Sequence, residues 1–283
     1  MRIAVMADIH GNHVALERCL AHAEQQGAEA YWFLGDYLGE LPCPQRTMEM
    51  LYAWAENHPC VFIRGNKENY WLGALDTSLW QRGSSTTGVL WYMGQRVTER
   101  DKAFFAGLPI ARVMELPGLP AVTICHGSPR DVGERLVPPG ETAHEAMEAA
   151  QTPLILCGHR HRQAWLEHAG RRAVNPGAVG VSLQSGGKAE YMLLEGLDGR
   201  WQETMVQLDY DVEQVIEEMR REQLFEIAPC WMRVTAGVLR GMNVSQVSVL
   251  GRAMALCEAG EGSCHWPHIP EKYWEMACEE AGV

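Results

Sequence analysis

The feature that most constrains the fold of this sequence is a short apolar run that stops abruptly at a polar residue or a glycine, a pattern that occurs five times. Each run is apolar on both faces, so the pattern predicts strands that are buried on both sides of a sheet. Helical periodicity follows the first two runs, at 13–26 and 46–57, and this alternation is typical of an α/β layered fold. The predicted strands are residues 3–7, 31–34, 60–63, 121–125 and 154–157.

The pattern changes in the second half of the chain. Further strands joined by Gly-containing turns predict a second, partly antiparallel sheet between residues 163 and 207. Asp211 is a suitable N-cap for the first of several helices that follow. We therefore expect an α/β domain at 1–210 and a helical C-terminal extension at 211–283 that packs on its core. The strands of the second sheet are expected at 163–166, 172–175, 189–194 and 201–207, and the helices at 212–222, 228–239, 245–258 and 271–280.

Composition excludes several classes of partner. The chain of 283 residues has 36 acidic and 24 basic side chains, and its net charge of −12 argues against long nucleic acids and against anionic membrane surfaces. No run approaches the roughly 20 apolar residues of a membrane helix. Asp8 and His10 interrupt the N-terminal apolar run, which is unlike a secretory signal. Nine cysteines without a Cys-x-x-Cys pair favour a cytoplasmic protein. Nothing in the sequence indicates an oligomeric state.

A side chain that can bind a metal ion follows every one of the five predicted strands. Because open α/β sheets build their sites at the carboxyl ends of the strands, we expect these side chains to converge. Small neighbours, such as Gly35 and Gly158, allow tight turns close to a bound ion. The set holds four imidazoles, two carboxylates and one amide: Asp8, His10, Asp36, Asn66, His126, His159 and His161.

The number and chemistry of these donors predict two metal ions. Seven ligands are too many for one tetrahedral zinc, whereas two ions about 3.5–4 Å apart that share a carboxylate accommodate them. Nitrogen and oxygen donors without thiolate suit Mn, Fe, Ni or Zn. Two divalent cations against two carboxylates leave a locally positive pocket for an anionic substrate.

As an ordered set, these motifs resemble those of the calcineurin-like metallophosphoesterase superfamily, and most of all its compact bacterial and archaeal phosphodiesterase branch. The resemblance covers residues 3–180. The tail after residues 209–211 is more loosely similar to small Gram-positive bacterial members described as diadenosine polyphosphate hydrolases and phosphodiesterases. The matching motifs are Asp8-Ile9-His10-Gly11-Asn12, Gly35-Asp36-Tyr37-Leu38-Gly39, Gly65-Asn66-Lys67-Glu68, His126-Gly127, Gly158-His159-Arg160-His161 and Asn175-Pro176-Gly177.

The resemblance implies a four-layer α-β-β-α sandwich with the site on the rim between the sheets, followed here by the helical extension. It also implies that Asp36 bridges the two ions. Asp8, His10, Asp36 and His161 would hold the first ion, and Asp36, Asn66, His126 and His159 the second.

The activity implied by the resemblance is hydrolysis of phosphodiester or phosphoanhydride bonds, in a small phosphorylated substrate such as a diadenosine polyphosphate. A hydroxide between the ions would attack phosphorus in line with the leaving group, because the metals lower the pKa of water. Asp36, Asn66 and His126 would act in catalysis through the metals and this hydroxide.

Lys67 departs from the family pattern. Many members have a histidine after the asparagine, and that histidine is taken to protonate the leaving group. A lysine with a pKa near 10.4 is a poor acid at pH 7. We therefore expect phosphoanhydrides and activated diesters to react better than alkyl monoesters. Lys67 itself either contacts a substrate phosphate or is solvated.

Other residues near the motifs have two interpretations each. Asn12 and His13 either face the pocket or, for Asn12, cap a helix. Arg160 either contacts phosphate or points away, and Glu68 is expected to support a ligand or begin a helix. Residues 67–97 are rich in aromatic side chains. They form either a cap that stacks on a nucleobase or helices that pack on the core.

Two other functions fit the same fold. The first is a phosphomonoesterase, including a protein phosphatase, although no strongly basic peptide-binding segment supports it. The second is a non-catalytic scaffold, as in a eukaryotic trafficking subunit of this fold. All seven expected ligand positions hold competent residue types, which favours catalysis.

Overall fold

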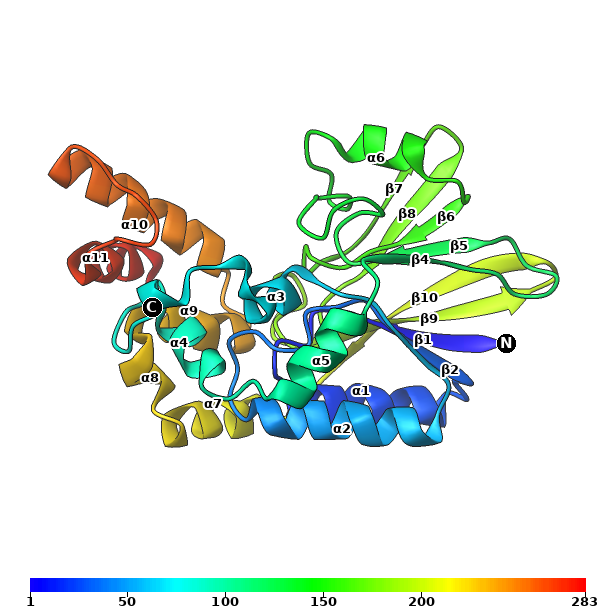
Figure 1. Ribbon diagram of the computed structural model, residues 1–283, viewed down its shortest axis with the longest axis horizontal. Coiled ribbons are helices and arrows are strands. Elements are labelled where there is room, and N and C mark those ends of the chain that lie inside the picture. The colour runs from blue at the N-terminus through cyan, green and yellow to red at the C-terminus, as the bar shows by residue number, and fades with distance from the viewer.

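The computed structural model describes residues 1–283, and its strands form two five-stranded sheets that face each other (Figure 1). In the first sheet, whose order is β10-β9-β1-β2-β3, the three N-terminal strands are parallel. The two late strands are antiparallel to their neighbours. The bounds are β1 (Arg2–Met6), β2 (Ala30–Phe33), β3 (Cys60–Phe62), β9 (Ala189–Leu197) and β10 (Arg200–Leu208).

The second sheet has the order β4-β5-β6-β8-β7. Its three central strands are parallel, and an antiparallel strand closes it at each edge. The bounds are β4 (Ala111–Met114), β5 (Val122–Cys125), β6 (Leu154–Leu156), β7 (Gln163–His168) and β8 (Arg171–Pro176).

Side-chain alternation along the strands builds four layers. Ile3 and Val5 of β1 pack between the sheets, in one cluster with Ile124 and Leu156 of the second sheet. Met6, on the opposite face of β1, belongs to the cluster under the helices. Because both faces are buried, these strands are apolar throughout. Figure 1 shows the helices of the outer layers, α1 (His13–Gln25) and α2 (Pro44–Asn57) below the first sheet and α6 (Ala143–Ala149) above the second.

Along the chain between β3 and β4 there are short helices that pack on the main core. Trp71 and Tyr92 of the aromatic segment 67–97 are buried in that core, so part of this segment packs as helices against the domain. The elements are α3 (Asn66–Asn69), helical turns at Tyr70–Ala74 and Thr77–Leu79, α4 (Gly88–Gly94) and α5 (Glu99–Gly107).

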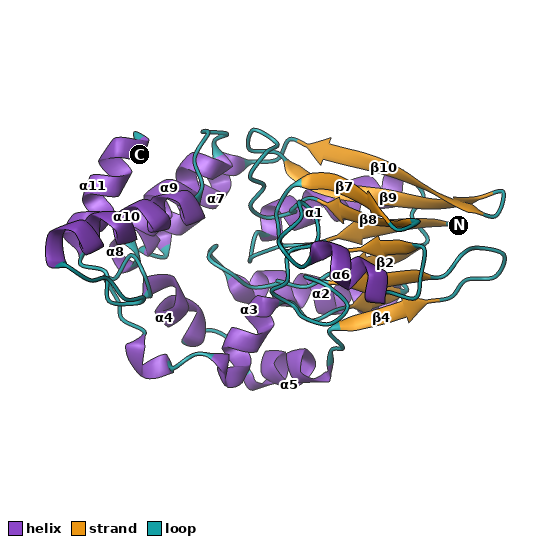
Figure 2. Cartoon of the chain, turned by 90° about the horizontal axis from the view of Figure 1, so that it is seen from above, coloured by secondary structure: helices purple, strands orange, loops and turns teal.

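The C-terminal helices gather at one end of the molecule, beyond the ends of the strands (Figure 2). Ile216 and Met232 are buried in the main core, whereas Val249 and Trp274 belong to a separate apolar cluster. The bounds are α7 (Val212–Arg221), α8 (Leu224–Ile227), α9 (Pro229–Leu239), α10 (Gln246–Glu261) and α11 (Glu271–Ala281).

One expectation about the sheets was wrong, and a second feature of the sheets was not anticipated. The last two strands, β9 and β10, do not join the second sheet, because β9 pairs antiparallel with β1 of the first. The five apolar strands also do not share one sheet, since β1–β3 lie in the first and β5 and β6 in the second. Strand partners are chosen by contacts between distant segments, which local periodicity does not encode. The helices expected at 13–26, 46–57 and in the tail are present within a few residues.

None of the helices combines the length and the apolar character needed to cross a lipid bilayer.

Candidate metal centre

Loops at the carboxyl ends of strands from both sheets bring the candidate ligands together. Asp8 Oδ1 lies 3.4 Å from His161 Nε2 and 3.9 Å from the Nε2 atoms of both His10 and His126. Asp36 directs one oxygen to each side, with Oδ2 3.5 Å from His10 Nε2 and Oδ1 3.4 Å from His126 Nε2. Each carboxylate oxygen of Asp36 therefore faces a different imidazole.

Asn66 and His159 complete the group around His126. Asn66 Oδ1 lies 3.1 Å from His126 Nε2 and 2.8 Å from His159 Nδ1. The backbone N–H of His159 donates to the carboxylate of Asp8. All seven side chains singled out in the sequence thus belong to one connected cluster.

The backbone at the strand ends is unusual. Five candidate ligands have positive φ, a region that residues other than glycine adopt rarely. Asp8 and His10 are both in this conformation, and both reach the cluster although they are only two residues apart. His159 and His161 repeat the arrangement. Strained backbone of this kind is concentrated at functional sites. The φ values are 55° for Asp8, 53° for His10, 55° for Asp36, 68° for His159 and 51° for His161.

Three imidazoles are oriented by acceptors on the side away from the cluster. The acceptors are backbone carbonyl oxygens for His126 and His161 and the Glu40 carboxylate for His10. His126 Nδ1 lies 2.7 Å from Leu34 O and His161 Nδ1 lies 2.7 Å from Val181 O. Because a carbonyl oxygen only accepts, Nδ1 of each ring carries a hydrogen, and Nε2 is the atom that faces the cluster. His10 Nε2 is buried and has no hydrogen-bond partner. This orphaned nitrogen and the mixed nitrogen and oxygen donors fit a metal centre.

The ionisable groups of the cluster shift one another's pKa values. Burial by itself raises the pKa of Asp36, but the imidazoles of His126 and His10 hold it well below its usual range. Burial lowers the pKa of His126, whereas Asp36 and Asp8 raise it to about 9. Burial and His126 together lower the pKa of His159 to about 4. The buried carboxylates are thus paired with the positive charge of imidazoles, a charge that divalent cations would supply when bound.

Glu40 is a residue of this site that sequence reasoning missed. Its Oε2 lies 2.8 Å from His10 Nδ1, and its Oε1 accepts a hydrogen bond of 3.4 Å from Gln246 Nε2 at the start of α10. Burial raises the pKa of Glu40, but His10 outweighs this effect and lowers it to about 2. The ionised carboxylate orients His10 and joins the metal centre to the C-terminal helices. No local pattern marks a contact between residues 206 positions apart.

Glu68 fixes the loops that carry Asp36 and Asn66. Its carboxylate accepts hydrogen bonds from the backbone N–H groups of Asp36, Tyr37 and Gly65 at 2.7–2.9 Å. A side chain at position 65 would collide with the Asp36 carboxylate, so glycine is required there. Glu68 therefore supports a ligand and begins α3, as the sequence indicated.

The residues proposed to contact substrate occupy different places. Lys67 and Arg160 line a cavity of about 450 Å³ above the cluster. Asn12 and His13 do not line it. Asn12 caps α1 by accepting from Ala15 N and also donates to Gly180 O. His13 Nε2 lies 3.5 Å from Glu218 Oε2 on α7. Cavity residues that the sequence did not single out include Arg135, Arg162, Ser245, Gln246 and Ser248.

A family model matches the part of the chain that carries all seven of these side chains. The family model described as "Calcineurin-like phosphoesterase superfamily domain" matches residues 1–198. An uncharacterized protein of Methanocaldococcus jannaschii, MJ0912, is 23% identical over 241 residues, which cover 79% of this chain and 94% of that protein. The match to the family model ends before α7–α11, so the C-terminal helices lie outside it.

Solved structures share the fold. A metallophosphoesterase from Sphaerobacter thermophilus is 25% identical, with a TM-score of 0.63 over 79% of this chain and 95% of that chain. The hypothetical protein PH1004 from Pyrococcus horikoshii OT3 is 20% identical, with a TM-score of 0.67 over 81% of this chain and 97% of that chain. Both of these solved chains are thus matched over almost their whole length.

Proposed function

The chain belongs to the calcineurin-like phosphoesterase superfamily, and from this premise we propose that it hydrolyses phosphodiester or phosphoanhydride bonds of a small nucleotide at a dinuclear metal centre. The observation that carries the proposal is the position of Asp36, whose two carboxylate oxygens face separate groups of donors. Asp8, His10 and His161 would hold one ion, and Asn66, His126 and His159 the other. When bound, Mn, Fe, Ni or Zn ions would activate water and neutralise charge on the phosphate.

The cavity above the cluster supports an anionic substrate. Arg135, Arg160 and Arg162 all line it. Burial and the charges of the other two arginines lower the pKa of Arg160, and its Nε is buried without a hydrogen-bond partner. Side chains that repel each other in this way are stabilised by a shared anion. The first turn of α10, which begins at Gln246, adds the positive end of a 16-residue helix.

Lys67 binds and orients phosphate in this proposal, but it does not protonate the leaving group. Burial by itself lowers the pKa of Lys67, yet Glu40 and Tyr70 raise it above its ordinary value. A lysine held in its charged form is a poor proton donor at neutral pH. Good substrates would therefore be those whose leaving group departs as a stable anion, such as a nucleotide phosphate.

A substrate panel with Mn²⁺ tests the proposal. We expect turnover of diadenosine tetraphosphate and bis-p-nitrophenyl phosphate to exceed turnover of p-nitrophenyl phosphate, and glycerol phosphate to be the poorest substrate. Asp36→Asn protein, prepared in parallel, controls for contaminating activity. Preference for glycerol phosphate would instead favour the phosphomonoesterase. Fewer than one ion per chain, together with no turnover after addition of Mn, Fe, Ni or Zn, would favour the non-catalytic scaffold.

A further inference from the structure

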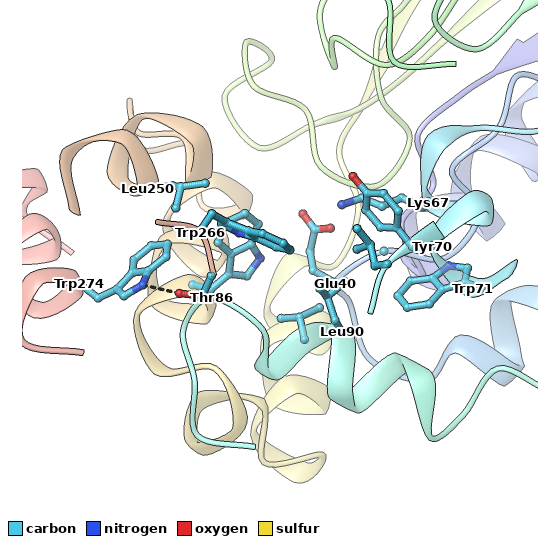
Figure 3. A pocket seen from close by; sticks show the side chains of 13 residues that line it. Glu40, Lys67, Tyr70, Trp71, Thr86, Leu90, Leu250, Trp266 and Trp274 are labelled. Carbon is cyan, nitrogen blue, oxygen red and sulfur yellow. Dashed lines mark hydrogen bonds between the residues drawn. The ribbon is translucent and has the colours of Figure 1, made fainter. Parts of the chain in front are cut away.

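A second cavity, of about 370 Å³, adjoins the metal centre. Nine of its 13 lining residues are hydrophobic, in contrast to the polar cavity above the cluster. Figure 3 shows Tyr70 and Trp71 on one side of it and Trp266 and Trp274 on the other, with Glu40 between them. One wall therefore comes from the segment after β3 and the other from the C-terminal helices. We call this space the aromatic pocket.

The aromatic pocket and the cavity of the metal centre are continuous. Glu40, Lys67 and Trp231 line both. Glu40 also contacts His10 of the metal cluster at 2.8 Å. A ligand with its phosphate at the metals can therefore extend past Lys67 into the aromatic pocket.

Hydrogen bonds hold two of the indoles in the pocket walls in place. Trp274 Nε1 donates to Thr86 Oγ1 at 2.9 Å, and Trp71 Nε1 donates to Leu38 O at 3.2 Å. Trp266 is different, since it remains 44% exposed although it lines the pocket. Trp231 Nε1 is buried and has no hydrogen-bond partner. The pocket thus has two fixed indoles, one exposed ring and one N–H without an acceptor.

This set of groups suits a flat heteroaromatic ligand better than an aliphatic one. Indole faces stack on the flat faces of nucleobases. The volume lies within the range of about 300–1,000 Å³ that is typical of small-molecule sites. An aliphatic chain would fill the space but would not stack on the indole faces.

We propose that the aromatic pocket binds the base of a nucleotide whose phosphates lie in the cavity of the metal centre. Lys67, at the junction, contacts the phosphate nearest the nucleoside. The substrate class is then a nucleoside or dinucleoside polyphosphate, and its base is recognised jointly by residues 67–97 and by the C-terminal helices. This inference rests on the proposed function for the reaction, but not for the binding of the base.

Binding to the metal-free, full-length chain tests the pocket without any catalysis. Calorimetric titration is expected to show at least tenfold tighter binding of AMP than of ribose 5-phosphate, which lacks the base. Trp266→Ala should weaken AMP binding about 5- to 150-fold, the range for loss of one base–aromatic stack, and should weaken ribose 5-phosphate binding much less. Trp266→Phe should restore most of the affinity. Trp165→Ala is the matched control, because Trp165 is 62% exposed on β7 and lines neither cavity.

Kinetics with the Mn²⁺-loaded protein separate the two proposals. Trp266→Ala should raise KM for diadenosine tetraphosphate by a larger factor than KM for inorganic tripolyphosphate, which has no base, whereas Trp165→Ala should change neither. Equal binding of AMP and ribose 5-phosphate, or AMP binding unchanged in Trp266→Ala, overturns the base pocket even if the protein hydrolyses phosphate bonds. Absence of hydrolysis with every metal, together with AMP binding that depends on Trp266, overturns the proposed reaction and supports the pocket.

Discussion

In the candidate metal centre, a single carboxylate contacts several neighbouring groups at once. Asp36 faces imidazoles on both sides, and its Oδ1 also accepts the backbone N–H of Lys67 at 2.8 Å. Glu40 is not one of the seven candidate ligands, but its carboxylate contacts the Nδ1 atom of the candidate ligand His10. Replacing each carboxylate by the amide of the same size therefore separates a bridging role from an orienting one.

We expect Asp36→Asn to disable both metal sites. An amide keeps the size of the side chain but offers one neutral oxygen in place of two charged ones. The loss in kcat/KM should exceed the roughly 10- to 100-fold typical of residues that only orient a ligand. Metal content per chain and kcat/KM are the measurements. His13→Ala, whose contact is with Glu218, should change kcat/KM only modestly. Wild-type turnover of Asp36→Asn would refute the dinuclear arrangement.

Glu40→Gln should weaken metal binding without abolishing the reaction. The amide removes the negative charge beside His10 Nδ1, and such changes typically cost about 10- to 100-fold in metal affinity or activity. Competition with a chelator measures the affinity, and kcat at saturating Mn²⁺ should recover most of its wild-type value. Glu49→Gln, at an exposed position on α2, is the control. Unchanged metal affinity in Glu40→Gln would show that Glu40 does not support His10.

At the scale of elements, α11 joins the segment before α4 to the C-terminal helices. Glu271, its first residue, accepts hydrogen bonds from the backbone N and Oγ of Ser85 at 2.7 and 2.6 Å. Ser85 Oγ in turn accepts the backbone N–H of Cys230 at 2.9 Å, near the start of α9. Trp274 adds its bond to Thr86. The two walls of the aromatic pocket are therefore tied together at their base.

Trp274→Ala should destabilise this region strongly. The indole is fully buried in the cluster shared by α9, α10 and α11, and truncation of a buried tryptophan costs about 3–5 kcal/mol. Denaturant unfolding measures the loss. Trp165→Ala should stay within about 0.5 kcal/mol of wild type, as is usual for exposed positions. A loss below 1 kcal/mol in Trp274→Ala would show that the helices do not depend on this cluster.

For the whole molecule, the metal centre is a junction between the two sheets. Asp8, Asp36 and Asn66 follow strands of the first sheet, whereas His126 and His159 follow strands of the second. An ion bound by both sets stabilises the contact between the sheets. It also provides positive charge for a phosphate substrate in a chain whose net charge is −12.

Metal addition should therefore raise the melting temperature of the whole protein. A ligand that binds only the folded state increases the free energy of unfolding by about 2.7 kcal/mol when its concentration is 100 times its Kd. Differential scanning calorimetry of chelated protein with increasing Mn²⁺ should show a rising Tm, and Asp36→Asn should show a much smaller rise. A Tm independent of Mn²⁺ up to millimolar concentration would contradict a metal centre between the sheets.

Local patterns in the sequence were sufficient for much of this structure. A strand buried on both faces is apolar throughout, as at residues 3–7. A helix shows apolar residues that recur with the helical period, as at 13–26. The candidate ligands could be singled out because they follow such runs within a few residues. Pairing of β9 with β1 was not predictable, because strands that join either sheet carry the same pattern.

The sequence by itself determined the order of the elements, the chemistry of the seven donors and their places at strand ends. Only the tertiary structure decided which sheet each strand joins, that Glu40 and Gln246 meet behind His10, and that Trp266 and Trp274 face Tyr70 and Trp71 across one pocket. The physical reason is the range of the interactions. Periodicity and turn chemistry act over a few residues, whereas these contacts join segments about 200 residues apart and depend on packing of the whole chain.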